Sequence, residues 1–265
     1  MPFTLSHAAA ALPLRRMKLI PSALVLGTFA PDLEYFARMS PGDGYGHTLP
    51  GTFLLTLPLA LVTLWLFHAF VKRPLIAVLP EGLRCRLAPY LGKFRFLGAA
   101  RFAWIVFSLL VGIATHLLWD SFTHYDTWLY RKWPLLQEKV AVLSFGTLPL
   151  YKILQHGSTL VGIAVLAAWS AHWYRSTEPT HETRPLAGRD PHKIATLAAI
   201  LLIALAGAAI RAVCVVGVPT HHVSITRFAG VLVVTSIALT WWQFVLLGAL
   251  TQRQPDSPSH YHIAL

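Results

Sequence analysis

Charged residues are scarce in this sequence, and acidic residues are the scarcest of them. Only 12% of the 265 residues are charged, and only 11 are acidic, whereas soluble domains carry roughly 25% charged residues. Hydrophobic residues reach 55%, and several of them gather in runs close to the ~20 residues needed to cross a bilayer. The composition therefore excludes an ordinary soluble domain and predicts an integral membrane protein.

Cysteine is also nearly absent. Cys85 and Cys214 are too few and too far apart for a disulfide framework or a thiolate metal site, so we expect two ordinary small apolar residues. The net charge of +11 comes with no motif for RNA or DNA binding, and we expect no nucleic-acid partner. Basic residues concentrated in loops instead favour contact with anionic lipid headgroups.

The apolar runs predict an all-α fold, a polytopic membrane helical bundle. We expect five spans, at residues 52–70, 103–121, 157–174, 194–216 and 228–250. Before them, "LIPSALVLGTFA" (19–30) is apolar but short and stops at Pro31-Asp32. This segment predicts an N-terminal half-helix or interfacial helix. The opening "MPFTLSHAAAALPLRRMK" has its basic residues after its apolar stretch, so we expect no cleavable signal peptide.

Loop charges predict the orientation of the spans. The loop 71–101 contains seven Lys and Arg residues against one acid, Glu81, and this excess marks a cytoplasmic loop. Counting onward places 122–156 and 217–227 outside and 175–193 inside. We therefore expect a multi-pass membrane protein whose spans are oriented in this way. Basic residues at 15–18 also favour the cytoplasm, so the path of the N-terminal residues stays open.

Composition divides the chain into four predicted regions. Residues 1–175 would form a histidine-rich helical domain with three spans, and 176–193 a polar cytoplasmic linker containing proline. Residues 194–250 would form a plainer helical hairpin of two spans, and 251–265 a flexible tail.

The segment "HLLWDSFTH" (116–124) ends the second predicted span with three potential metal ligands. His116, Asp120 and His124 are four residues apart, so a helix would place them on one face. An ionisable group in a span is costly without a partner or water, and a cation would compensate the carboxylate. Imidazole and carboxylate hold catalytic zinc and related ions, and Asp120 could bridge two metals. The alternative is a His–Asp pair that ties helices together.

Four other residues are candidates for the same site. Asp32 follows the half-helix and could be a ligand or a helix N-cap. His47 in "GYGHTLPG", His156 in "YKILQHGS" and His7 in "TLSHAAAAL" could each be an ordinary solvated or interfacial histidine. The predicted topology puts Asp32, His47, His124 and His156 on one membrane face, which favours a shared site on the extracytoplasmic side.

Several of these motifs occur together in a known order. "MPFTLSHAAAALPL", "LVLGTFAPDLEYF", "THLLWDSFTH" and "YKILQHGSTLVG" resemble a family of bacterial integral membrane proteins of unknown function, over most of 1–175 and more loosely beyond. More distantly, the order is similar to inner-membrane metal-dependent hydrolases and to the zinc-dependent phospholipase C and P1 nuclease group. Those helical enzymes bind clustered zinc ions and cleave phosphoesters.

The resemblance implies a set of metal ligands: His7, Asp32, His47, His116, Asp120, His124 and His156. Leu160 stands where the soluble phospholipases have a glutamate, and Met1 stands where they have a ligating tryptophan. These departures favour one or two divalent ions, most simply zinc, over three.

The sequence thus predicts a membrane-embedded metal-dependent hydrolase that acts on a phosphoester of a membrane lipid or a lipid-linked substrate. Asp32 and Asp120 are the predicted catalytic residues, because either could orient the attacking water as well as bind metal. Two alternatives stay open. The cluster could be a transit or proton site of a transporter or channel, or it could join the helices of an accessory protein.

Overall fold

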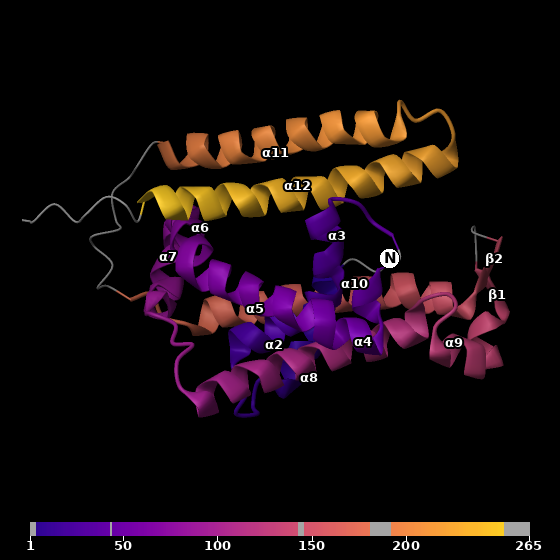
Figure 1. Ribbon diagram of the computed structural model, residues 1–265, viewed down its shortest axis with the longest axis horizontal. Coiled ribbons are helices and arrows are strands. Elements are labelled where there is room, and N and C mark those ends of the chain that lie inside the picture. Colours follow the sequence, from indigo (N-terminus) through magenta and orange to yellow (C-terminus); the bar gives the residue numbers. More distant parts are fainter. Residues whose placement is uncertain (1–3, 43, 143–145, 181–191, 252–265) are drawn as a thin grey trace, which may run out of the picture. The chain divides into compact units, whose positions relative to one another are not determined.

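The computed structural model describes residues 4–42, 44–142, 146–180 and 192–251. The described chain is helical almost throughout (Figure 1), with five helices long and apolar enough to cross a membrane. They are Leu49–Val78, Ala99–Thr123, Leu150–Ser176, Lys193–Val216 and His222–Thr251. Each contains one predicted span, so the all-α polytopic bundle is confirmed. Most of the predicted linker and all but the first residue of the predicted tail lie outside the described residues.

The chain divides into two compact units. Unit 1 comprises Met1–Leu64 and Phe94–Glu178, and unit 2 comprises Trp65–Lys93 and Pro179–Leu265. The first boundary falls within the first long helix. The segment Trp65–Lys93, which the sequence grouped with the front portion, therefore belongs to the same unit as the C-terminal hairpin.

Unit 1 opens with short elements. These are η1 (Thr4–Ala10), α1 (Ala11–Leu14), α2 (Pro21–Gly27), η2 (Ala30–Asp32), α3 (Leu33–Arg38) and η3 (Tyr45–His47). Their lengths have local causes. Pro21 starts α2 at a first-turn position that needs no N–H donor. Met39, with a φ of 52°, ends α3 in the left-handed conformation. The predicted half-helix is thus α2 followed by η2.

The first long helix contains two wide π-helical turns. It runs through α4 (Leu49–Gly51), η4 (Thr52–Thr56), α5 (Leu57–Leu66), η5 (Phe67–Val71) and α6 (Lys72–Val78). Pro58 and Pro74 follow the two π turns, η4 and η5. A proline ring clashes with the carbonyl four residues earlier, and here those residues are Leu54 and Phe70, inside the π turns. Widening the helix at these points accommodates each proline without ending the span.

The second long helix, α8 (Ala99–Thr123), carries the core of unit 1. Its buried Ile105, Leu109 and Ile113 belong to an apolar cluster with residues of α2 and α5. α2 lies directly on α8, because Gly27 meets Gly112: a Cβ on Gly112 would fall 2.7 Å from the Gly27 Cα. This close approach brings the end of α2 to the part of α8 that contains the predicted ligands.

Between α8 and the third long helix lies a small segment that the sequence analysis did not predict. It consists of α9 (Trp128–Lys132), η7 (Pro134–Gln137) and an antiparallel hairpin of β1 (Lys139–Val142) and β2 (Gly146–Pro149). Lys139 pairs with Pro149, and Val142 with Gly146. The next helix, α10 (Leu150–Ser176), begins directly after Pro149. It therefore starts before the predicted span and includes His156.

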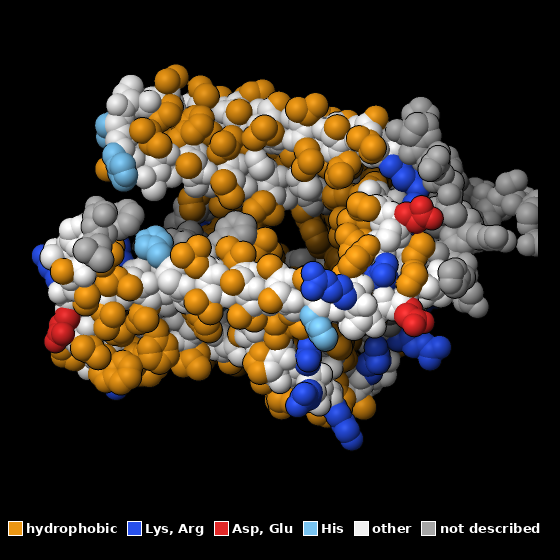
Figure 2. All heavy atoms as spheres, turned by 180° about the vertical axis from the view of Figure 1, so that it is seen from behind, with side chains coloured by type: hydrophobic (Ala, Val, Ile, Leu, Met, Phe, Trp, Pro, Cys, Tyr) orange, Lys and Arg blue, Asp and Glu red, His pale blue; other side chains and the backbone are white. Residues whose placement is uncertain are grey.

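Unit 2 is built around α11 (His192–Val216) and α12 (His222–Thr251), with α6, α7 (Glu81–Leu87) and η6 (Ala88–Leu91). α11 buries Ala204, Ala208 and Ala212, one side chain per turn. The Lys72 ammonium donates to the carbonyl oxygens of Tyr90 and Gly92. Figure 2 shows hydrophobic side chains along the exposed lengths of the helices, as expected for a multi-pass membrane protein.

Candidate metal centre

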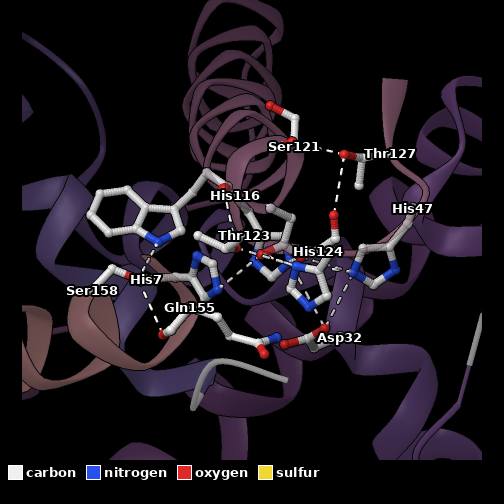
Figure 3. A network of polar contacts seen from close by, with 12 residues as sticks. His7, Asp32, His47, His116, Ser121, Thr123, His124, Thr127, Gln155 and Ser158 are labelled. Atoms are coloured by element: carbon white, nitrogen blue, oxygen red, sulfur yellow. Dashed lines mark hydrogen bonds and ion pairs between the residues drawn. The ribbon is translucent and has the colours of Figure 1, made fainter. Parts of the chain in front are cut away.

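Six of the seven predicted ligands converge in unit 1 (Figure 3). They are His7, Asp32, His47, His116, Asp120 and His124, here called the His/Asp cluster. Its members come from the N-terminal short elements and from the end of α8. The cluster contains two triplets whose ligand atoms lie within 4.8 Å of one another. The triplets are His7–His116–Asp120 and Asp32–His47–His116.

The end of α8 supplies three members of the cluster in two different ways. His116 and Asp120 stack one turn apart as predicted, with 3.1 Å between His116 Nε2 and Asp120 Oδ2. His124 does not continue this helical face. α8 ends at Thr123, and His124 is extended, with φ −117° and ψ 151°. Its Nδ1 still reaches within 3.3 Å of Asp120 Oδ1, because its N–H donates to the Asp120 carbonyl and keeps the turn closed.

The Asp120 carboxylate lies at the centre of the cluster. Its Oδ2 is 3.1 Å from His116 Nε2 and 3.6 Å from His47 Nε2. Its Oδ1 is 3.4 Å from His7 Nε2 and 3.3 Å from His124 Nδ1. Each oxygen thus faces its own pair of imidazoles, which is the arrangement of a carboxylate able to bridge two cations.

Hydrogen bonding indicates which nitrogen of His116 is available to a metal. The His116 Nδ1 lies 2.9 Å from the carbonyl oxygen of Thr28. A carbonyl only accepts, so Nδ1 carries the hydrogen. In the neutral ring Nε2 then has a free lone pair, aimed at Asp120 and at His47 Nε2, 3.3 Å away. Metal-binding histidines commonly donate their second N–H to a backbone carbonyl in this way.

The charge states of the N-terminal members also suit a metal. Burial, and secondly the neighbouring His116, lowers the pKa of His7 to about 4, so its ring is neutral at pH 7. Burial raises the pKa of Asp32, but the hydrogen bond with His47, the charge of His116 and the hydrogen bond from Thr4 outweigh it and hold this pKa below its ordinary value. Metal binding requires neutral imidazoles and ionised carboxylates, so a cation would take the place of the protons through which His47 and His116 stabilise the Asp32 carboxylate.

The spacing of the donor atoms fits a divalent metal. Zinc–ligand distances imply that neighbouring donors in a tetrahedral site lie about 3.3–3.6 Å apart. The imidazole–carboxylate distances in the cluster run from 3.1 to 3.8 Å. The buried Asp120 Oδ1 has no hydrogen-bond partner, which is costly for a carboxylate oxygen away from water. A cation held between Oδ1 and the two nearby imidazoles would remove that cost.

The cluster has a closed side and an open side. The side chains of His116, His7 and Asp32 are at most 4% exposed. Those of His47 and His124 are 23% and 27% exposed. A water molecule or a substrate would therefore approach the cluster between His47 and His124.

The loop that carries His47 is held by side chains that the sequence analysis did not select. Glu34 Oε2 accepts a hydrogen bond from the Gly46 N–H at 2.9 Å, and the Thr56 hydroxyl donates to the Gly46 carbonyl at 3.0 Å. The Tyr35 ring stacks on the His47 ring at 5.6 Å. Glu34 and Tyr35 directly follow Asp32 in "PDLEY", and that adjacency is the signal that could have identified them.

Thr4 supports Asp32 in a similar way. Its hydroxyl donates to Asp32 Oδ2 at 2.6 Å, which leaves Asp32 Oδ1 facing His47 and His116. The sequence analysis did not single out this contact, because the two residues are joined only by the folding of η1 against η2.

His156 is the predicted ligand that the structure does not bring to the cluster. It is exposed on α10 and lies outside both triplets of the described residues. The preceding residue, Gln155, is buried instead, and its side chain points toward the cluster in Figure 3.

Comparison with known proteins gives one match. No curated protein and no solved structure matches the chain. A family model described as "Domain of unknown function (DUF4184)" matches residues 1–250. The match includes the whole His/Asp cluster and nearly all of the five long helices. The chain therefore belongs to the DUF4184 family.

Proposed function

We propose that the protein is a membrane-embedded, metal-dependent hydrolase of phosphoesters. The observation that carries the proposal is the central Asp120 carboxylate, with a pair of imidazoles facing each oxygen. Histidine and aspartate in a partly open site are the ligands of catalytic zinc. One or two zinc ions are therefore the expected cofactor.

The contacts of Asp120 divide the cluster into two ligand sets. Oδ2 belongs with His116, His47 and Asp32, which would give one ion four protein ligands. Oδ1 belongs with His7 and His124, which would give the other ion three. Catalytic zinc sites keep a position open for water or substrate. The Oδ1 set is thus the better candidate for the reacting side, and it includes the exposed His124.

The chemistry of the proposal is attack of water on phosphorus with loss of the ester oxygen. Bound divalent ions lower the pKa of a coordinated water toward neutrality and polarise a phosphoryl oxygen. The chain contributes two ionised carboxylates, Asp32 and Asp120, that can accept a hydrogen bond from the attacking water and orient it. Thr4 holds Asp32 for this role through its 2.6 Å hydrogen bond.

The position of the cluster along α8 supports a lipid or lipid-linked substrate. His116 lies seven residues before the end of α8 at Thr123, which corresponds to about 10 Å of helix. Such a depth suits an ester bond at headgroup level, with the apolar part of the substrate left in the bilayer. Arg95 and Arg101 lie at the opposite end of α8. By the positive-inside tendency, the cluster would face the extracytoplasmic side of the inner membrane.

A hydrolysis assay on the zinc-loaded protein tests the proposal. The full chain is reconstituted in nanodiscs and given bis(4-nitrophenyl) phosphate or phospholipid vesicles, and the products are measured. We expect hydrolysis by the wild type and loss of hydrolysis in Asp120→Asn. Asp126→Asn is the matched control, because Asp126 is exposed and pairs with Arg131 rather than with the cluster.

The alternatives give different results in the same preparation. Zinc binding with no hydrolysis of either substrate, together with zinc or proton flux into proteoliposomes, would favour a transporter. Little in the described α11 and α12 supports a transport path, since Thr235 is their buried polar residue. A protein that retains no zinc, but is less stable when His116 and Asp120 are replaced by alanine, would favour a structural role.

A further inference from the structure

One face of α10 is held against the His/Asp cluster by two contacts. Gln155, Ser158 and Gly162 are spaced at i, i+3 and i+7 and share a helix face. A Cβ on Gly162 would lie 2.9 Å from the Ser6 backbone oxygen, so α10 rests directly on the segment beside His7. Trp119 of α8 donates to the Ser158 hydroxyl at 3.2 Å. These contacts set the rotation of α10 and turn Gln155 inward.

Gln155 is a largely buried residue whose side-chain amide has no hydrogen-bond partner among the described residues. The residue is 8% exposed. Its backbone carbonyl accepts from the hydroxyls of Ser158 and Thr159, but these bonds leave the side-chain amide unused. Figure 3 shows that side chain running from α10 toward the cluster. Neither amide atom is among the fully buried atoms without a partner, so the amide stays within reach of water or of a bound ligand.

The groups around Gln155 indicate what that ligand needs. The atoms that would hold a metal in the cluster are carboxylate oxygens and imidazole nitrogens without a hydrogen, and they offer no N–H to a phosphoryl group bound there. A phosphoryl oxygen only accepts, so a donor from a neighbouring element would complement these ligands. Arg38 is engaged by Glu34 at 3.5 Å and by the Gly42 carbonyl, and Lys152 is exposed. The amide NH₂ of Gln155 is a donor at every pH, and its side chain points toward the cluster.

We propose that Gln155 is a substrate-binding residue that donates a hydrogen bond to a non-bridging oxygen of a phosphoryl group held at the His/Asp cluster. This inference rests on the proposed function, because it assigns one contact of the same phosphoester. The ligand class is a tetrahedral phosphate, either a lipid phosphoester or the inorganic phosphate released from it. Gln155 binds no metal in this assignment, so zinc content and phosphate affinity should respond separately.

Binding of inorganic phosphate to the zinc-loaded full chain, measured by calorimetry, tests the assignment. We expect Gln155→Leu to retain the zinc content of the wild type and to weaken phosphate binding about tenfold, the loss of one hydrogen bond to a charged group. Gln155→Glu should weaken it at least as much, because it places a negative charge beside the anion. Gln137→Leu is the matched control, since Gln137 is exposed and donates to the Tyr130 carbonyl.

The outcomes separate this assignment from the proposed function. Unchanged phosphate affinity in Gln155→Leu, or a wild type that binds zinc but no phosphate, overturns the role of Gln155. Zinc lost together with phosphate makes Gln155 a metal ligand and also overturns it. If phosphate binding depends on Gln155 but no ester is hydrolysed, the Gln155 contact is supported and only the proposed hydrolase activity is rejected. If Gln155→Leu does not fold, the measurement is repeated with Gln155→Met, which is close to glutamine in shape. Binding of a lipid phosphomonoester in vesicles, compared with binding of inorganic phosphate, distinguishes a lipid ligand from free phosphate.

Discussion

The helices α8 and α11 have the same length, 25 residues, and both are apolar, yet their buried faces differ. The inward line of α11 is Ala204, Ala208 and Ala212. The inward line of α8 has the same spacing of four and reads Ser108, Gly112, His116 and Asp120. The alanine line allows close packing and needs nothing further. The polar line of α8 requires partners, and the N-terminal segment supplies them in order.

Those partners follow α8 turn by turn. The Ile20 N–H donates to the Ser108 hydroxyl at 2.9 Å, and Gly27 packs on Gly112. The Thr28 carbonyl then accepts from His116. The buried polar line of α8 therefore fixes the position of its neighbours more closely than the alanine line of α11 does, because each polar group requires a particular partner atom against it. Unit 1 acquires a candidate site from the same positions at which unit 2 acquires only close helix packing.

The largest expected effect is loss of metal from Asp120→Asn. The substitution removes the charge of the carboxylate that the proposal assigns to both ligand sets, and we expect zinc affinity to fall on the order of a hundredfold or more. Metal analysis with chelator competition measures it. Asp126→Asn should retain wild-type zinc. Full zinc retention by Asp120→Asn would mean that the polar line of α8 does not form the metal site, and the proposed difference from α11 would be lost.

Removal of zinc should lower the local stability of the segments around the His/Asp cluster and leave unit 2 unchanged. A ligand present at a hundred times its Kd stabilises the state that binds it by about 2.7 kcal/mol. A chelator should therefore speed amide hydrogen exchange in η1, η2 and the last turns of α8, and leave α11 and α12 unchanged. Hydrogen-exchange mass spectrometry reports both regions in one experiment. Equal changes in α11 and α12 would show that the metal does not act through the cluster.

Thr4→Val should weaken zinc binding without removing a ligand. It deletes the 2.6 Å hydrogen bond to Asp32 Oδ2, and loss of such a supporting contact costs about 10–100-fold in metal affinity. Thr4→Ser keeps the hydroxyl and should keep wild-type affinity, which chelator competition would show. Equal weakening by both variants would mean that the methyl group of Thr4, rather than its hydroxyl, matters.

Overpacking the two lines should give similar stability losses but different effects on metal. Ala208→Leu and Gly112→Ala each insert atoms where there is no room, at a cost of about 1–3 kcal/mol. Only Gly112→Ala should also lower zinc affinity, because it pushes α2 and the Thr28 carbonyl away from α8. Thermal unfolding and zinc titration measure the two effects.

Gly157 provides the control for a glycine substitution within unit 1. A Cβ on Gly157 would meet nothing within 4 Å. Gly157→Ala should therefore stabilise α10 by about 0.5–1 kcal/mol through its helix propensity and leave zinc binding unchanged. A loss of zinc affinity in Gly157→Ala would contradict the role given to close packing at Gly112.

Local patterns in the sequence determined the spans and the pairing of His116 with Asp120. A long apolar run predicts a span, and an i, i+4 spacing predicts a shared helix face, whatever the helix packs against. The convergence of His7, Asp32 and His47 with His116 and Asp120 also follows the predicted set, which rested on candidate side chains, on the predicted topology and on a resemblance. Periodicity and composition do not contain it, since these residues lie on separate short elements.

Only the tertiary structure decided which neighbour on α10 faces the cluster. Successive helix residues point about 100° apart, so the choice between Gln155 and His156 depends on how the helix is rotated. That rotation is set by Gly162 against Ser6 and by Trp119 on Ser158. The same applies to His124, which reaches Asp120 from beyond the helix end. Sequence spacing specifies neighbours along one element, whereas contacts between elements specify which side chains meet.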